Sequence, residues 1–458
     1  MTLRHKPSLS TRTFAQNTQS SSPNVDTGLK AGSVGWILLA ALGVAFVISG
    51  DFAGWQFGLE RGGFGGMFIA VLIVAAMYYC MCLCLGELSA ALPSAGGGYR
   101  FASVALGRTG GYVTAAAVLL EYVIAPAALP AFIAGYLSGI GLNPFETNWP
   151  IALICYGVFV GLHLCGAGEA MRVLLAMTAL SMLALVVYCF YLLPHADLAN
   201  FTDNGAAHNP TGFFPHGFVG IWAAFPFAIW FFLAVEGVPM AAEEAKNPAK
   251  DIPRAIKVSM GVLLCSALAM LIIGPAAATS GVIGASNNPL VDALHHIGAH
   301  SAVIKFISGA ALLALITSFF SITYGYSRLI YSLARDKVLP DFLGRTNRRG
   351  APTWALILPA ILGLVLTVFF DGDTLMSVAV FGAVVSYALI MISFIVLRRN
   401  RPQLQRPYVA PGGVATAGFA LAITCIAIVA VFISDWRVGL CGLLLLLAMT
   451  GWYKVQRQ

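Results

Sequence analysis

The sequence predicts an all-α membrane protein with twelve transmembrane helices. Of its 458 residues, 59% are apolar and 10% are charged, and the mean hydropathy is +0.84. A soluble domain carries about 25% charged residues, so this composition is typical of a protein that lies in a membrane. A helix needs about 20 mostly apolar residues to cross the hydrocarbon core, and twelve stretches of the chain meet that need.

These twelve stretches are separated by short polar turns. They span residues 33–59, 64–92, 109–140, 150–167, 171–193, 217–241, 257–279, 302–333, 351–370, 374–397, 412–434 and 438–453. Residues 1–30 are rich in Ser, Thr and Gln and have no apolar core. We therefore expect a disordered cytoplasmic tail there and not a cleavable signal.

The basic residues predict how the chain is oriented. If the N-terminus is inside, 23 of the 26 Lys and Arg residues lie in tails or turns on the cytoplasmic side, and only Arg61, Lys305 and Arg437 lie outside. This bias follows the positive-inside rule. We expect a multi-pass protein of the cell membrane with both termini in the cytoplasm. The net charge of +7 then reflects loops that face anionic lipid, and a nucleic-acid partner is not expected.

Two acidic residues interrupt apolar stretches at matching positions. Asp51 lies in the first stretch and Glu236 in the sixth, and each stands next to a glycine. An aspartate at mid-membrane costs roughly 2.5–3.5 kcal/mol, and matching interruptions in two halves indicate an inverted repeat. We expect 31–200 to form one repeat of five helices and 201–400 an opposite repeat, while 401–458 adds two helices and a cytoplasmic C-terminus.

The two interruptions should face each other, because irregular backbone inside a membrane must lie against protein or water. The first N–H groups of the second half-helix would hold a carboxylate in an amino-acid carrier. We expect Asp51 at that position, where it would pair with an ammonium group or cap a half-helix that begins at Phe52. Its charge would disfavour a second anion there.

Other intramembrane residues join this predicted site. Glu121 lies about 20 Å along the third helix, close to the midplane, as a ligand, a proton carrier or a structural glutamate. Aromatic residues beside the breaks either wall a cation site or simply pack. The predicted substrate-binding residues are Ser49, Gly50, Asp51, Trp55, Glu121, Trp230, Phe231, Leu233 and Glu236.

A second group of acids lies at the cytoplasmic ends of the predicted helices. Glu87, Glu243 and Glu244 stand beside basic loops. We expect them to form an inner gate or an ion-pair network with Arg100, Lys246 or Arg254.

The sequence gives no sign of a metal site, a cofactor or an enzyme. Cys80, Cys82 and Cys84 are two residues apart, so on a helix successive side chains point about 200° away from each other. All nine cysteines lie in or beside apolar stretches and predict no disulfide framework. The motifs HExxH and GxSxG do not occur.

Several segments resemble a known family. ELSAALPSAGGGYRFASVALG (87–107) and EEAKNPAKDIPRAI (243–256) resemble the signature loops of the amino acid-polyamine-organocation transporter superfamily, and the likeness extends over about residues 30–453. Within that superfamily, VISGDFAGWQFGLERGGFGG (47–66) resembles the ethanolamine permeases. The resemblance implies a leucine-transporter-like fold of two inverted five-helix repeats with helices 1 and 6 broken, and a substrate site between helices 1, 3, 6 and 8.

The function that we expect is import of a small organic amine, with ethanolamine foremost, by alternating access and without a cofactor. An amino-acid or polyamine permease or exchanger of the same fold is the alternative. A membrane sensor would need a soluble output domain, and a membrane-embedded enzyme would need a group of catalytic residues. The sequence shows neither, so these two classes are less favoured. The coupling ion stays open between H⁺ and Na⁺, as do uniport and exchange, and Thr317, Ser318, Ser321 and Thr323 are candidate sodium ligands.

Overall fold

The protein is described by a computed structural model that covers residues 32–165, 170–203 and 212–455. Within these ranges the chain is helical, and its only strand-like contacts are two isolated bridges, Val34 with Ala245 and Thr346 with Pro352. The predicted tail, residues 1–30, lies outside the described ranges.

The helices follow the predicted apolar stretches. Their bounds are α1 (Trp36–Val47), α2 (Ser49–Phe52), α3 (Gln56–Ala91), α4 (Gly98–Gly139), α5 (Trp149–Leu164), α6 (Ala170–Leu192), η1 (Leu193–His195), η2 (Leu198–Phe201), α7 (Gly217–Trp230), η3 (Val235–Ala241), α8 (Pro248–Gly284), α9 (Pro289–His296), α10 (Ser301–Arg335), η4 (Asp341–Gly344), α11 (Thr353–Phe369), α12 (Gly372–Asn400), α13 (Val414–Ser434) and α14 (Trp436–Val455).

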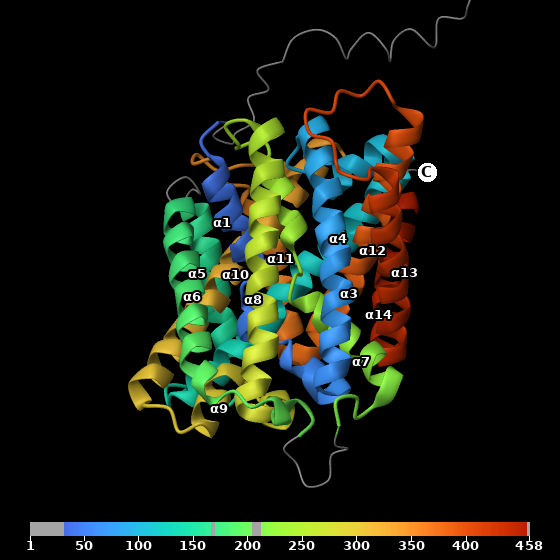
Figure 1. The fold of residues 1–458 in the computed structure, drawn as a ribbon. Helices are drawn as coiled ribbons and strands as arrows, with labels where there is room; N and C mark the ends of the chain where they lie inside the picture. The colour runs from blue at the N-terminus through green and yellow to red at the C-terminus, as the bar shows by residue number, and fades with distance from the viewer. Residues whose placement is uncertain (1–31, 166–169, 204–211, 456–458) are drawn as a thin grey trace, which may run out of the picture.

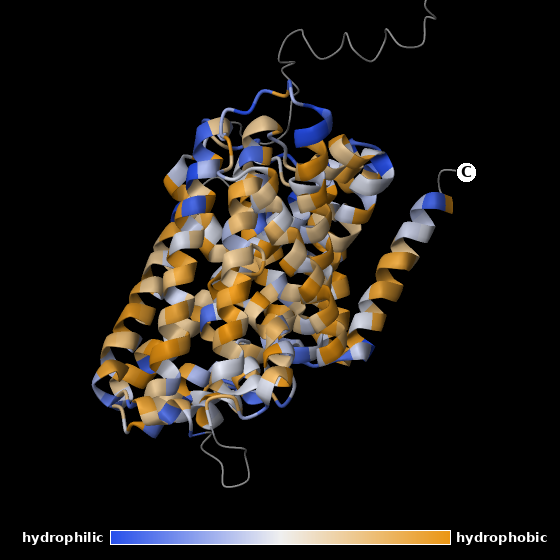
Figure 2. Ribbon diagram, turned by 45° about the vertical axis from the view of Figure 1, so that its right-hand side comes forward, coloured by the Kyte–Doolittle hydropathy of each residue, from blue (hydrophilic) through white to orange (hydrophobic). Residues whose placement is uncertain are grey.

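Length and hydropathy identify the helices that cross the membrane. In the described ranges, nine segments are long and apolar enough, and the shorter apolar helices Trp36–Phe52, Trp149–Leu164 and Thr353–Phe369 bring the number to the predicted twelve. Figure 2 shows hydrophobic residues over the middle of the bundle and hydrophilic residues at its two ends. The protein is therefore a multi-pass membrane protein.

Kinks divide two of the longest helices where glycine permits a left-handed backbone. Gly63 in α3 has φ +66, so residues 56–62 complete the first membrane segment and the second begins at Phe64. A side chain at Gly63 would meet the ring of Pro215 at 2.2 Å. Gly107 has φ +78 and separates residues 98–106 from the third membrane helix. These turns are the boundaries that the polar interruptions in the sequence predicted.

The bundle brings both ends of the described chain to one side. Figure 1 shows that α1 begins and α14 ends at the upper end of the bundle. Small residues let the central helices approach closely. A Cβ on Gly382 of α12 would lie 2.8 Å from the carbonyl oxygen of Ala117 and 2.9 Å from the backbone nitrogen of Glu121 on α4. This contact positions α12 beside the buried acid of α4.

Candidate substrate site

The first membrane segment breaks just beyond Asp51. The chain stays helical through Phe52, Ala53 is extended with φ −157 and ψ 153, and Gly54 has φ +100. The helix resumes at Gln56, whose Oε1 accepts a hydrogen bond from the Gly54 N–H at 2.6 Å. Glycine is needed at position 54, because φ is left-handed and a Cβ would lie 2.3 Å from Nε1 of Trp230.

This position of the break excludes one of the two roles expected for Asp51, that of a cap on the half-helix that follows. Its N–H donates to the Ile48 carbonyl at 3.2 Å, so Asp51 belongs to the last turn before the break and does not cap the half-helix after it. The carboxylate is fully buried, and its Oδ2 accepts a 2.7 Å hydrogen bond from the Ser266 hydroxyl of α8. Its Oδ1 has no partner among the described residues. The helix therefore continues through Asp51 to Phe52, and Ser266 of α8 satisfies one of the two carboxylate oxygens.

The sixth membrane segment breaks between Trp230 and Val235. Helix α7 ends at Trp230, and Ala234 adopts the left-handed conformation with φ +74 before η3 begins. A left-handed backbone is costly for a residue other than glycine, by roughly 1–2 kcal/mol. The Ala234 carbonyl accepts hydrogen bonds from the Tyr122 hydroxyl at 3.1 Å and from the Gly237 N–H at 3.0 Å. These bonds hold the strained turn against α4.

The two breaks lie against each other, as the sequence predicted. Trp230 donates its indole N–H to the Ala53 carbonyl at 2.9 Å, and the rings of Trp55 and Phe231 stack with centroids 5.4 Å apart. A Cβ on Gly50 would lie 2.7 Å from the Trp230 carbonyl oxygen. Aromatic side chains therefore close the space between the breaks.

Glu121 and Glu236 form a buried pair of acids beside the second break. The Tyr387 hydroxyl of α12 lies 2.9 Å from Oε2 of Glu236 and 3.3 Å from Oε1 of Glu121. The Tyr78 hydroxyl of α3 lies 3.3 Å from the same Tyr387 hydroxyl. Glu121 and Glu236 are 0% and 2% exposed. Four membrane segments therefore bring polar groups to one point of the core.

All nine predicted substrate-site residues are buried, but they do not all face one cavity. Asp51 faces α8, whereas Glu121 and Glu236 face α12. Ser49 donates its N–H to the Ser318 hydroxyl at 3.0 Å, and that hydroxyl donates to the Ala45 carbonyl at 2.9 Å. The other three candidate sodium ligands, Thr317, Ser321 and Thr323, donate to carbonyls of their own helix.

Sequence reasoning missed the residues that complete this region. Ser266, Tyr78, Tyr122 and Tyr387 supply the hydroxyl groups around the three acids. Tyr122 directly follows Glu121 on α4, whereas Ser266, Tyr78 and Tyr387 lie on other helices, so no local spacing links those three to the acids. A polar residue in an apolar span is the only signal that the sequence offered for them.

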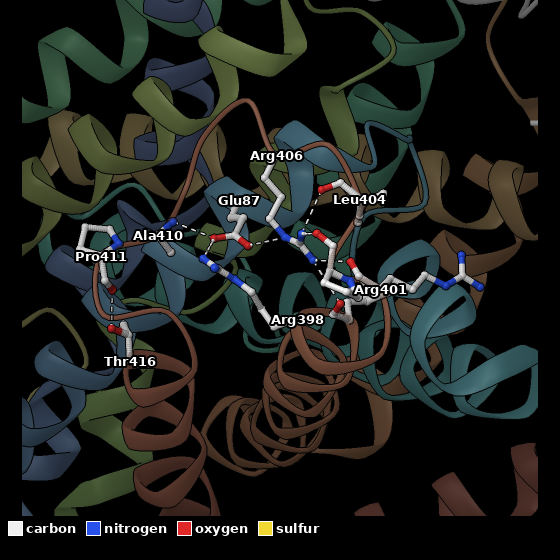
Figure 3. A network of polar contacts seen from close by, with 10 residues as sticks. Glu87, Arg398, Arg401, Leu404, Arg406, Ala410, Pro411 and Thr416 are labelled. Carbon is white, nitrogen blue, oxygen red and sulfur yellow. Dashed lines mark hydrogen bonds and ion pairs between the residues drawn. The ribbon is translucent and has the colours of Figure 1, made fainter. Parts of the chain in front are cut away.

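At the end of the bundle that the sequence predicts to be cytoplasmic, two arginines hold Glu87. Its carboxylate pairs with Arg398 and with Arg406 Nε at 3.1 Å and accepts a 2.7 Å bond from the Ala410 N–H. Figure 3 shows these groups converging on Glu87 from the end of α12 and from the loop between α12 and α13. The expected partners, Arg100, Lys246 and Arg254, are not the ones used, because arginines distant in sequence fold over this end of α3.

Glu243 and Glu244 pair with α10. The Arg335 guanidinium donates to Glu243 at 2.8 and 3.0 Å, and Arg328 donates to Glu244 at 3.1 Å. Burial raises the pKa of Glu243, but the bonds from Arg335 and from the Ala95 N–H outweigh it and leave that pKa below its ordinary value. Of the predicted arginine partners, Arg254 instead lies 3.7 Å from the Trp36 ring centroid, and Arg100 is exposed.

The described residues contain no group of three or more His, Cys, Asp or Glu side chains that would hold a metal. The nine cysteines are free thiols. The carboxylates, hydroxyls and aromatic rings between the breaks are groups that can bind cations and protons.

Comparisons with known proteins agree on one family. The model of the amino acid permease family matches residues 32–438. The chain is 28% identical to the branched-chain amino acid permease BcaP of Lactococcus lactis, over 73% of this chain and 75% of that protein. It is 24% identical to the uncharacterized transporter R00093 of Rhizobium meliloti, over 81% and 80%. It is also 26% identical to cationic amino acid transporter 4 of Mus musculus, over 72% and 54%.

Proposed function

Because the chain belongs to the amino acid permease family, whose members are transporters and not enzymes, we propose that it carries amino acids of net positive charge across the membrane by alternating access. This replaces ethanolamine as the principal substrate. The twelve-helix, leucine-transporter-like fold with helices 1 and 6 broken is the one that this family uses.

The observation that carries the proposal is the charge around the breaks. Asp51, Glu121 and Glu236 are buried there, and the one arginine among the buried residues of the described chain, Arg328, is paired with Glu244. Uncompensated negative charge in a medium of low dielectric constant favours a cation and disfavours another anion. A substrate with two amino groups and one carboxylate satisfies this region better than a neutral zwitterion does.

We assign the substrate's ammonium group to Asp51. Its Oδ1 is buried and has no partner in the described ranges, while Oδ2 is held by Ser266. A hydrogen bond between an ammonium and a carboxylate is about twice as strong as one between neutral groups. Trp55, Trp230 and Phe231 would wall the site, and Ser49, Gly50 and Leu233 would line it. Glu87, Glu243 and Glu244 would keep its cytoplasmic side closed.

Ethanolamine is the second candidate, because the breaks are packed tightly. A Cβ on Gly50 or Gly54 would already lie 2.7 or 2.3 Å from the backbone or side chain of Trp230. A small cation needs less rearrangement here than a long side chain. The likeness of residues 47–66 to the ethanolamine permeases supports the same candidate.

Uptake into proteoliposomes tests the proposal. We expect labelled lysine to accumulate, unlabelled ethanolamine or arginine to inhibit it strongly, and leucine to inhibit it weakly. Stronger inhibition by leucine would overturn the charge argument. Uptake of labelled ethanolamine by proteoliposomes that do not take up labelled lysine would favour the second candidate.

The orientation and the two repeats are also proposals. We propose that both termini are cytoplasmic and that 31–200 and 201–400 form the inverted repeats. The common position of the start of α1 and the end of α14 supports the first part (Figure 1). A C-terminal green fluorescent protein should fluoresce, and a C-terminal alkaline phosphatase should be inactive; the reverse result would contradict this orientation.

A further inference from the structure

We propose that Glu121, Glu236 and Tyr387 together hold one exchangeable proton, and that this proton is the ion coupled to substrate transport. The inference rests on the proposed transport function and adds the coupling ion and its binding site. It separates the three buried acids into a substrate ligand, Asp51, and a proton-binding pair.

The first argument is a count of hydrogens. A hydroxyl group has one hydrogen and can accept two further bonds, whereas an ionised carboxylate can only accept. The Tyr387 hydroxyl contacts Glu236 at 2.9 Å, Glu121 at 3.3 Å and the Tyr78 hydroxyl at 3.3 Å. If Tyr387 donates to its nearer carboxylate, Glu236, the contact with Glu121 is a hydrogen bond only when Glu121 carries a proton and donates it.

The second argument is the contact between the two acids themselves. The carboxyl groups of Glu121 and Glu236 both contact the Tyr387 hydroxyl, at 3.3 Å and 2.9 Å, so the two acids lie close to each other. Two ionised carboxylates repel each other and have no hydrogen to share, so one proton is needed to hold them on the same hydroxyl. Oε2 of Glu121 and Oε1 of Glu236 are buried and otherwise have no partner in the described chain.

The third argument is the absence of another source of positive charge. The groups that face the pair are Tyr78 and Cys82 of α3, Tyr122 of α4 and Tyr387 of α12. None of these is basic, and the ion pairs found in the described ranges include neither Glu121 nor Glu236. The charge of the pair must therefore be balanced from outside the protein.

The proton-binding pair lies between the second break and two of the membrane helices. Glu236 lies on η3, directly after the strained turn at Ala234, whereas Glu121 and Tyr387 lie on α4 and α12. With the proton bound, these elements are joined. Without the proton, two negatively charged carboxylates face each other across the break. Their repulsion disfavours the arrangement in which both contact Tyr387. Proton binding and helix movement are thereby coupled.

The test uses the purified full chain in proteoliposomes with a pH-sensitive dye inside. We expect substrate uptake by the wild type to acidify the interior and to be driven by an inward proton gradient. Glu121→Gln, which imitates the protonated acid, should still exchange internal for external substrate. Its accumulation of substrate under a proton gradient should be at least tenfold lower than that of the wild type. Its exchange should also become independent of pH between 5 and 8.

Tyr387→Phe is the second variant, and Tyr326→Phe is its matched control. Both remove a hydroxyl from a fully buried tyrosine, but Tyr326 donates to the Leu356 carbonyl, away from the pair. We expect Tyr387→Phe to shift the pH dependence of uptake and Tyr326→Phe to leave it unchanged. Equal effects of the two changes would overturn the assignment of Tyr387.

Three results would overturn the coupling proposal. The first is wild-type uptake that moves substrate without protons, which would leave the transport function intact. The second is normal proton-driven accumulation in folded Glu121→Gln and Glu236→Gln. The third is joint loss of exchange and accumulation in folded Glu121→Gln, which would make Glu121 a substrate ligand. Failure of the wild type to move lysine, ethanolamine or leucine would instead refute the proposed function.

Discussion

Replacement of Asp51 by asparagine tests the substrate ligand that we propose. The change keeps the size of the side chain and an oxygen that can accept the 2.7 Å bond from Ser266, but it removes the charge. A hydrogen bond to a charged group contributes about 1.5–3 kcal/mol. Since about 1.4 kcal/mol corresponds to a factor of ten, the affinity for a cationic substrate should fall about tenfold to over a hundredfold.

The assay is equilibrium binding of labelled lysine to the purified protein, with ethanolamine as a second ligand. Ser266→Ala is the control, because it removes the neutral partner of Asp51 and keeps the carboxylate, so the affinity should fall less than in Asp51→Asn. Size-exclusion chromatography and thermal unfolding establish that both variants are folded. Unchanged affinity in a folded Asp51→Asn protein would refute the assignment of the ammonium group to Asp51.

Three further substitutions, two of them with a control substitution, test other parts of the structure. Glu87→Gln leaves Arg398 and Arg406 without their carboxylate and should lower the free energy of unfolding by about 2–3 kcal/mol, allowing for the partial exposure of Arg398. Asp341→Asn, in an ion pair whose side chains are 71% and 66% exposed, should change it by less than about 0.5 kcal/mol; equal shifts in thermal unfolding would contradict this. Because the pKa of Glu243 is lowered in the folded protein, its stabilising effect is present above the unfolded pKa of about 4.3 and is lost as the pH falls through the lower folded value. Glu243→Gln should therefore flatten the acid side of the profile of melting temperature against pH, and an unchanged profile would count against the Arg335 contact. Gly54→Ala should abolish transport because its Cβ would lie 2.3 Å from Trp230 Nε1, whereas Gly261→Ala, with no atom within 4 Å of the added Cβ, should retain it; similar uptake rates for the two variants would argue against the tight contact.

The helices could be predicted from the sequence because membrane crossing depends on local hydropathy. The predicted boundary between the first two spans lies at Gly63, where glycine permits the turn. The exact position of the first break could not be predicted in the same way. The helix continues through Asp51 to Phe52, and the residue that donates to its carboxylate, Ser266, lies more than 200 residues away in the sequence.

The partners of the acids at the helix ends likewise could not be predicted from local patterns. Glu87, Glu243 and Glu244 were found because charge at the end of an apolar span is unusual. Their arginines come from α10 and from the end of α12 and the loop that follows it, so basic residues close to them in sequence were the wrong choice. Tyr387 contacts both Glu121 and Glu236, but nothing in the sequence links it to these acids until the helices are packed.

The central claim is that this transporter selects substrates of net positive charge. The most direct measurement is the ratio of inhibition constants for lysine and leucine against labelled lysine in the wild-type protein at pH 7. The account predicts that lysine binds at least about tenfold more tightly, as one additional charge-assisted hydrogen bond would provide. Equal constants, or tighter binding of leucine, would contradict it.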